Sequence, residues 1–128
     1  MSAKSNYLEL KVLDHFLGTA STTAPSAVYL SLHTANPAED GSGTEVSGNG
    51  YSRQAVTFAS ASGGSASSNS VEEFTASGGS FGTVTHFGIW DASSSGNLLY
   101  YGALTASKVI ADGDTLRFAS GAITITEA

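Results

Sequence analysis

The chain has 128 residues, of which 41% are hydrophobic and only 12% charged, a composition typical of one folded domain with an unusually neutral surface. Its net charge of −6, with 5 Lys and Arg residues, excludes the basic surface that binds nucleic acid. The absence of cysteine excludes disulfides, thiolate metal ligands and thiol nucleophiles.

The first segment predicts an amphipathic helix over residues 6–17, which Ser5 or Asn6 can cap. Its apolar stripe, at three- and four-residue spacing, consists of Tyr7, Leu10, Leu13 and Leu17. A helix of this length is marginal alone, so we expect residues 1–18 to dock on their own sheet or on a neighbour. Charged residues interrupt the N-terminal apolar residues, so they lack the unbroken apolar stretch of a signal peptide. No apolar segment is long enough to span a bilayer. We therefore expect a protein made in the cytoplasm, with no membrane partner.

The next segments predict short strands joined by polar loops. Alternation predicts a strand over 28–33, with Val28, Leu30 and Leu32 facing inward. Residues 34–50 form a long loop, and a loop of that length in a compact domain is usually functional, so Asn36 and Pro37 are candidate contacts. A strand over 54–58, a Ser/Gly-rich connection over 59–69 and a weaker strand over 70–75 follow.

Two strands around the turn at 93–97 make up residues 83–104. In the first, alternation places Val84, His86, Gly88 and Trp90 on one face, and Thr85, Phe87 and Ile89 on the other. Both faces are apolar, which indicates a strand covered on both sides by another sheet, a helix or a second copy.

The C-terminal residues predict three more short strands. They cover 108–111, 114–118 and 122–126, with Ile123 and Ile125 facing inward. The dipeptide Asp112-Gly113 is a strong hairpin signal between the first two. Residues 19–128 therefore predict an all-β domain, an antiparallel β-sandwich or jelly-roll-like fold, preceded by one N-terminal α-helix.

Little in the sequence indicates catalysis. The spacing of His15, His33 and His86 is not diagnostic of a metal site. Glu72 and Glu73 would point to opposite faces of a strand, so they cannot act together as acid and base. We predict no catalytic residue, no metal and no cofactor.

Two aromatic residues have two readings. Trp90 and Tyr100 would be exposed on a sugar-binding surface, whereas in a structural protein they would fill the core or the seam between subunits. Their position inside strands favours the core or seam.

Several segments resemble a widespread family of small tailed-bacteriophage virion proteins commonly labelled tail-fibre or structural proteins. The segments, in family order, are SNYLELKVLDHFLG, VYLSLHTANP, GTEVSGNGYSRQAVTF and FGTVTHFGIWDASSSGNLLYYGALTASKVIADGDTLRFASGAITIT. The resemblance implies a virion role and self-association, and it implies no catalytic residues. Heptads, collagen triplets and β-helical repeats are missing, so a compact knob, adaptor or decoration subunit fits better than a fibre shaft.

We therefore expect a non-enzymatic virion structural protein that forms a homo-oligomer, such as a trimer, and attaches to the particle surface. It would act as a capsid decoration (cement) protein on the major capsid protein, or as a tail-associated fibre or adaptor on tail proteins. The alternative is a receptor- or carbohydrate-binding module of a phage tail that uses Trp90 or Tyr100. A metal-dependent hydrolase is a third hypothesis, and a bound stoichiometric metal would support it.

Overall fold

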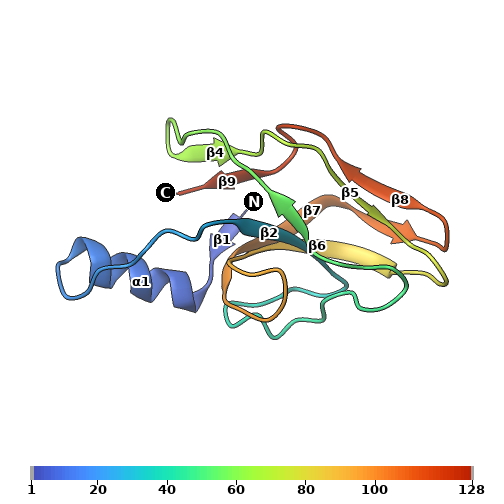
Figure 1. Cartoon of the computed structure of the whole chain (residues 1–128), viewed down its shortest axis with the longest axis horizontal. Helices are drawn as coiled ribbons and strands as arrows, with labels where there is room; N and C mark the ends of the chain where they lie inside the picture. The colour runs from blue at the N-terminus through green and yellow to red at the C-terminus, as the bar shows by residue number, and fades with distance from the viewer. Residues whose placement is uncertain (1, 128) are drawn as a thin grey trace.

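The computed structural model describes residues 2–127, which fold into two β-layers with one helix projecting from an end (Figure 1). In chain order the elements are β1 Ser2–Lys4, α1 Asn6–Phe16, β2 Val28–His33, β3 Gln54–Val56, β4 Ser65–Ser67, β5 Glu72–Thr75, β6 Gly82–Trp90, β7 Leu98–Ile110, β8 Thr115–Phe118 and β9 Thr124–Thr126.

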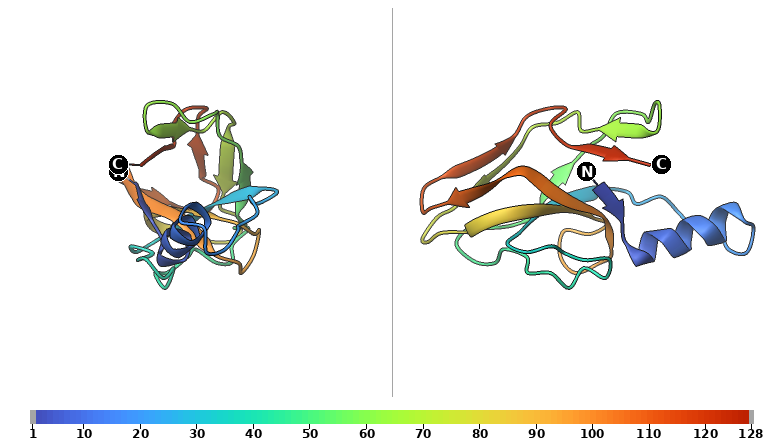
Figure 2. Two further views of the ribbon diagram at one scale, coloured as in Figure 1. Left: turned by 90° about the vertical axis from the view of Figure 1, so that its left-hand side faces the viewer. Right: turned by 180° about the vertical axis from the view of Figure 1, so that it is seen from behind.

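One layer is a five-stranded antiparallel sheet in the order β1-β7-β6-β2-β3. The other layer consists of two antiparallel ribbons, β4-β9 and β5-β8 (Figure 2). The predicted fold class is confirmed: a mostly-β, antiparallel, sandwich-like arrangement with one N-terminal helix. The helix α1 extends away from both layers.

The core lies between the two layers. Leu30 and Leu32 of β2 are fully buried, as the alternation predicted, and Val28 packs against them at the edge of the core. The ribbons contribute the buried side chains of Phe74, Leu116, Ile123 and Ile125. The inward prediction for Ile123 and Ile125 is therefore confirmed.

The predicted faces of β6 are wrong at one residue. A register shift separates Val84 from His86, because Val84 pairs with Lys108 but His86 pairs with Ala103 of β7. Four residues of β7, 104–107, therefore lie opposite a single residue of β6, and the alternation changes phase. As a result Val84 packs in the core with Phe87 and Ile89, rather than on the face of Trp90.

The register shift also lies where the sequence predicted a break in β7. Residues 98–104 and 108–111 were expected to be separate strands, and the structure joins them into one strand, Leu98–Ile110. The two halves pair with β6 on either side of the register shift.

The turn at Asp112-Gly113 exists, but the hairpin prediction is wrong. The Asp114 N–H donates to the Ala111 carbonyl oxygen at 2.9 Å, and Gly113 has a φ of 89°. However, β8 pairs with β5 rather than with β7. The turn therefore carries the chain from one layer to the other.

Four further differences concern short strands. The structure adds β1, and it adds β4 inside the predicted 59–69 connection. The strand predicted over 54–58 ends at Val56, after which Phe58 makes an isolated bridge to Ser68. The weaker strand begins at Glu72, and Val71 lies outside it with 46% of its surface exposed. Strands of three or four residues carry too little periodicity for sequence alone to place their ends.

Candidate interaction surface

Helix α1 is held at its start and is otherwise largely uncovered. Ser5 is the N-cap, where its hydroxyl oxygen accepts a bond from the Leu8 N–H at 3.2 Å and its O–H donates to the Leu98 carbonyl. The Ser5 N–H donates to the Leu99 carbonyl, which ties the helix start to β7. None of the residues of α1 is buried.

The apolar stripe of α1 points away from its own β-domain. The large side chains that remain more than half exposed are Leu10, Leu13, Phe16 and Leu17, with Phe16 at 77% and Leu13 at 54%. Tyr7, the fourth residue of the predicted stripe, is instead half-buried, and the Lys11 ammonium lies 5.6 Å from its ring centroid. We name Leu10, Leu13, Phe16 and Leu17 the helix face.

The 34–50 loop is folded tightly against the sheet. The Val46 N–H donates to the Leu32 carbonyl at 3.0 Å, and the Thr34 N–H donates to the Thr44 carbonyl at 3.0 Å. Asn36 is exposed, but Pro37 is fully buried and so presents no surface to a neighbour. The loop is therefore an ordered cover for the outer face of β2 and β6.

An ion pair between Glu45 and Arg53 holds the 34–50 loop in place. The guanidinium of Arg53 donates to both carboxylate oxygens of Glu45, at 2.9 and 2.8 Å, and the Tyr51 hydroxyl donates to Glu45 at 2.6 Å. Although partial burial raises it, the hydrogen bonds from Arg53 and Tyr51 hold the pKa of Glu45 below its usual range. Arg53 also donates to the carbonyls of Ala92 and Ser95, so it joins two loops.

Trp90 lies beneath that ion pair. The Arg53 guanidinium carbon is 3.9 Å from its ring centroid, and the His33 ring stacks on it at 6.4 Å with an interplanar angle of 11°. Its indole N–H donates to the Ser31 hydroxyl at 2.8 Å, and only 8% of the residue is exposed. With so little of its surface exposed, Trp90 offers no stacking platform for a sugar and is a buried residue beneath the loop.

His33 completes this cluster. Its Nε2 lies 2.8 Å from the Ser31 hydroxyl, whereas its buried Nδ1 has no hydrogen-bond partner within residues 2–127. Burial lowers the pKa of His33, and Arg53 and His86 lower it further against the opposing effect of Glu45. We name Ser31, His33, Glu45, Arg53 and Trp90 the polar centre.

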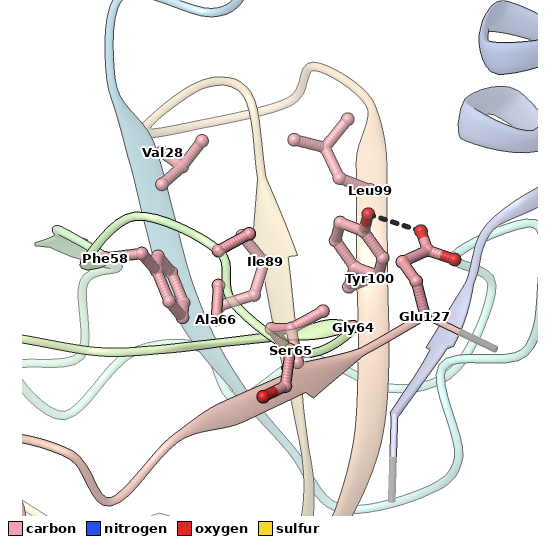
Figure 3. A pocket seen from close by; sticks show the side chains of 11 residues that line it. Val28, Phe58, Gly64, Ser65, Ala66, Ile89, Leu99, Tyr100 and Glu127 are labelled. Carbon is pink, nitrogen blue, oxygen red and sulfur yellow. Dashed lines mark hydrogen bonds between the residues drawn. The ribbon is translucent and has the colours of Figure 1, made fainter.

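Tyr100 borders an apolar cavity of about 280 Å³ between the layers (Figure 3). The cavity is lined by Val28, Phe58, Ile89, Leu99 and Ile125, among others. At its rim the Tyr100 hydroxyl donates to Glu127 at 2.8 Å, and Lys4 pairs with the same carboxylate at 2.8 Å. Tyr100 and Lys4 therefore both hold Glu127, which ties the C-terminal end of the chain to β7 and β1 at the rim of the cavity.

A larger groove of about 430 Å³ opens along the other part of β7. One wall is β7, with Leu104 and Lys108, and the other is β8, with Leu116, Arg117 and Phe118. The groove exists because β1 pairs only with residues 100–102 of β7, and no ladder joins β7 to β8. We name it the edge groove. No local sequence pattern predicts it, because its two walls belong to different layers and meet only in the folded chain.

The predicted contact residues do not form one surface. Leu10, Leu13 and Leu17 share the exposed helix face, whereas Trp90 and Pro37 are buried and Tyr100 lines the cavity. No sequence pattern indicated a role for Arg53 and Glu45, which are two charged residues in a largely neutral chain.

The three histidines do not converge on one place. His33 and His86 are register partners on β2 and β6, whereas His15 lies in the last turn of α1. Across residues 2–127 no group of three His, Cys, Asp or Glu side chains is arranged to hold a metal ion. Within the same residues, no helix has the length and apolar character needed to cross a membrane.

Comparison with known proteins adds one finding. No curated protein matches the sequence. Residues 3–126 match the family described as "Podophage GP4 fiber I protein gp80", which is nearly the whole chain. The match agrees with the resemblance to phage fibre and structural proteins. The chain therefore belongs to the podophage GP4 fibre I protein gp80 family, a family of phage fibre structural proteins.

Proposed function

We propose that this chain is a non-enzymatic structural subunit of a podophage tail fibre, which self-associates and attaches to other proteins of the virion. The family supports the fibre role. Its partners would be further copies of itself, in a homo-oligomer such as a trimer, and a tail protein to which the oligomer attaches.

The observation that carries the proposal is the helix face. An isolated helix of 11 residues is marginal in water, and α1 buries none of its residues against its own domain. Burying one large apolar side chain contributes about 1.5–3 kcal/mol, and the helix face exposes Leu10, Leu13, Phe16 and Leu17 together. Such a face favours contact with another protein.

The test compares purified virions that carry the wild-type chain or the variant Leu10→Ser/Leu13→Ser/Leu17→Ser. We expect the variant to fold and to be missing from the particles, measured as copy number by quantitative mass spectrometry. Val71→Ser, which changes an exposed apolar residue far from α1 in the sequence, is the matched control. Normal incorporation of the triple variant would contradict the proposed role of α1.

The same measurement separates the tail from the shell. A small copy number that matches a tail ring supports the fibre role. A copy number that matches the capsid lattice would instead identify a decoration (cement) protein bound to the major capsid protein.

A further inference from the structure

We infer that copies of this chain join head to tail, with the helix face of one copy seated in the edge groove of the next. This contact rests on the self-association proposed above and specifies the two surfaces that make it.

The two surfaces match in their apolar character. The helix face presents Leu10, Leu13 and Leu17 in one row. The edge groove has Leu104 and Phe118 on its walls, and both are only partly buried at the border of the core. A helix laid along this groove would cover the open edge of the sandwich, and each surface would remove the other from water.

The two surfaces also match in charge. By the 3.6-residue period of the helix, Asp14 lies beside Leu10 at one border of the helix face, and Glu9 lies between Leu13 and Phe16. The groove carries one exposed cation on each wall, Lys108 on β7 and Arg117 on β8. Arg117 has a single long ion pair, 3.8 Å to Glu73, and Lys108 makes none within residues 2–127. The two acidic groups of the helix face and its border would therefore meet the basic groups on the two walls of the groove.

Charge disfavours two other ways of covering the helix face. If two copies of α1 packed against each other, Glu9 and Asp14 would meet like charges. At the apolar cavity near Tyr100, the rim cation Lys4 is already neutralised by Glu127 at 2.8 Å. The edge groove, by contrast, carries Lys108 and Arg117, which can meet the acidic residues of the helix.

The placement of the two surfaces requires a second copy. Helix α1 projects from one end of the molecule, and β8 lies toward the opposite end (Figure 1, Figure 2). A chain's own helix face therefore cannot reach its own groove. A contact between two different surfaces of one chain is heterologous, so it builds a closed ring or an open filament. It gives a compact domain without shaft repeats a way to form an extended assembly.

The experiment uses charge reversal in the full chain. The helix variant is Glu9→Lys/Asp14→Lys, the groove variant is Lys108→Glu/Arg117→Glu, and a third variant carries all four changes. Sedimentation velocity over a concentration series gives the dissociation constant for each at low and moderate salt. The control, Ser47→Lys/Ser60→Lys, adds positive charge on exposed loops outside both surfaces.

We expect each reversed variant alone to bind itself at least about tenfold more weakly than the wild type, because like charges would then face each other. We expect assembly to return in the fourfold variant and in a mixture of the helix and groove variants. Added salt should weaken the wild-type contact, and the control should assemble like the wild type.

The failures are distinguishable. If the wild type assembles and the reversals change nothing, or the mixture does not recover, the contact is elsewhere and only this inference is overturned. If the wild type is monomeric at every concentration, proposed self-association is overturned with it. Circular dichroism of each variant identifies any loss due to misfolding, and recovery in the mixture requires that both variants are folded.

Discussion

The polar centre and the helix face differ in how they are covered: the first is buried within its own chain, and the second is exposed to solvent. In the polar centre, Glu45 of the 34–50 loop pairs with Arg53, and beneath this pair the Trp90 indole N–H donates to the Ser31 hydroxyl. Only 7% of the Arg53 side chain is exposed. The helix face, by contrast, leaves Leu17 73% exposed, with nothing of its own domain above it.

This difference indicates which part of the chain is complete within one molecule. Changes in the polar centre should act on the free energy of unfolding, because its partners belong to the same chain. Changes on the helix face should act on assembly, because its proposed partner belongs to another chain. The four predictions below test that division.

The largest effect is expected for Arg53→Ala. Removing Arg53 leaves the partly buried Glu45 of the loop without its counter-charge, which typically costs about 3–5 kcal/mol. Urea unfolding followed by the fluorescence of Trp90, the single tryptophan, measures it. Arg117→Ala is the matched control, because its ion pair is 3.8 Å long and more than half exposed, and it should change stability by less than about 1 kcal/mol. Equal losses would remove the distinction between the two pairs.

A smaller loss is expected for Gly88→Ala. A Cβ at this position would lie 2.7 Å from the Ser31 hydroxyl oxygen and 3.0 Å from the Trp90 indole nitrogen. Overpacking of this kind typically costs about 1–3 kcal/mol. Thr83→Ala, at an exposed position of the same strand, should stay within about 0.5 kcal/mol in the same urea titration. If Gly88→Ala is neutral, the polar centre is less tightly packed than described.

A smaller effect still is expected from pH, because it changes a charge without removing atoms. The pKa of His33 is lowered in the folded state, so the unfolded chain takes up the proton first as the pH falls. Its contribution to stability is present above about pH 6.5 and decreases below that value, until the pH passes the folded-state pKa. Urea midpoints measured across this range give the slope.

The variant His33→Gln is the control for the pH prediction, because it should lose this part of the slope. Glu45 acts in a separate window. Its lowered pKa gives stability above its ordinary value of 4.5 that is lost at lower pH. A slope above pH 5 that persists in His33→Gln would assign the effect to another group.

The smallest effect on unfolding is expected for Leu13→Ser on the helix face. Leu13 is 54% exposed, so the monomer should change by no more than about 0.5 kcal/mol. Sedimentation velocity should nevertheless show weaker self-association. A large loss of monomer stability would mean that the helix face is buried within its own chain in solution.

Several parts of the fold could be predicted because they depend on local patterns. The helix at Asn6–Phe16 and the strand at Val28–His33 follow from their apolar periods, and both lie where predicted. Alternation failed at Val84, because the register shift depends on how β7 pairs with β6. The Asp112-Gly113 turn was found, but its partner strand was not, since pairing between layers is a long-range choice.

The candidate surfaces were predicted less well than the fold. Periodicity placed Leu10, Leu13 and Leu17 on one side of a helix, but it could not say whether that side faces the domain or the solvent. The edge groove joins residues of β7, β8 and β9 and has no signature in any one segment.

The amino-acid sequence by itself therefore determined the helix, most of the strands, their inward faces where the ladder is regular, and the family. Only the tertiary structure decided that Trp90 and Pro37 are covered while the helix face is not. The physical reason is that periodicity is a local property, whereas burial depends on which distant segments pack over a residue. Leu17 and Leu32 are the same residue type, yet one is exposed and the other lies in the core.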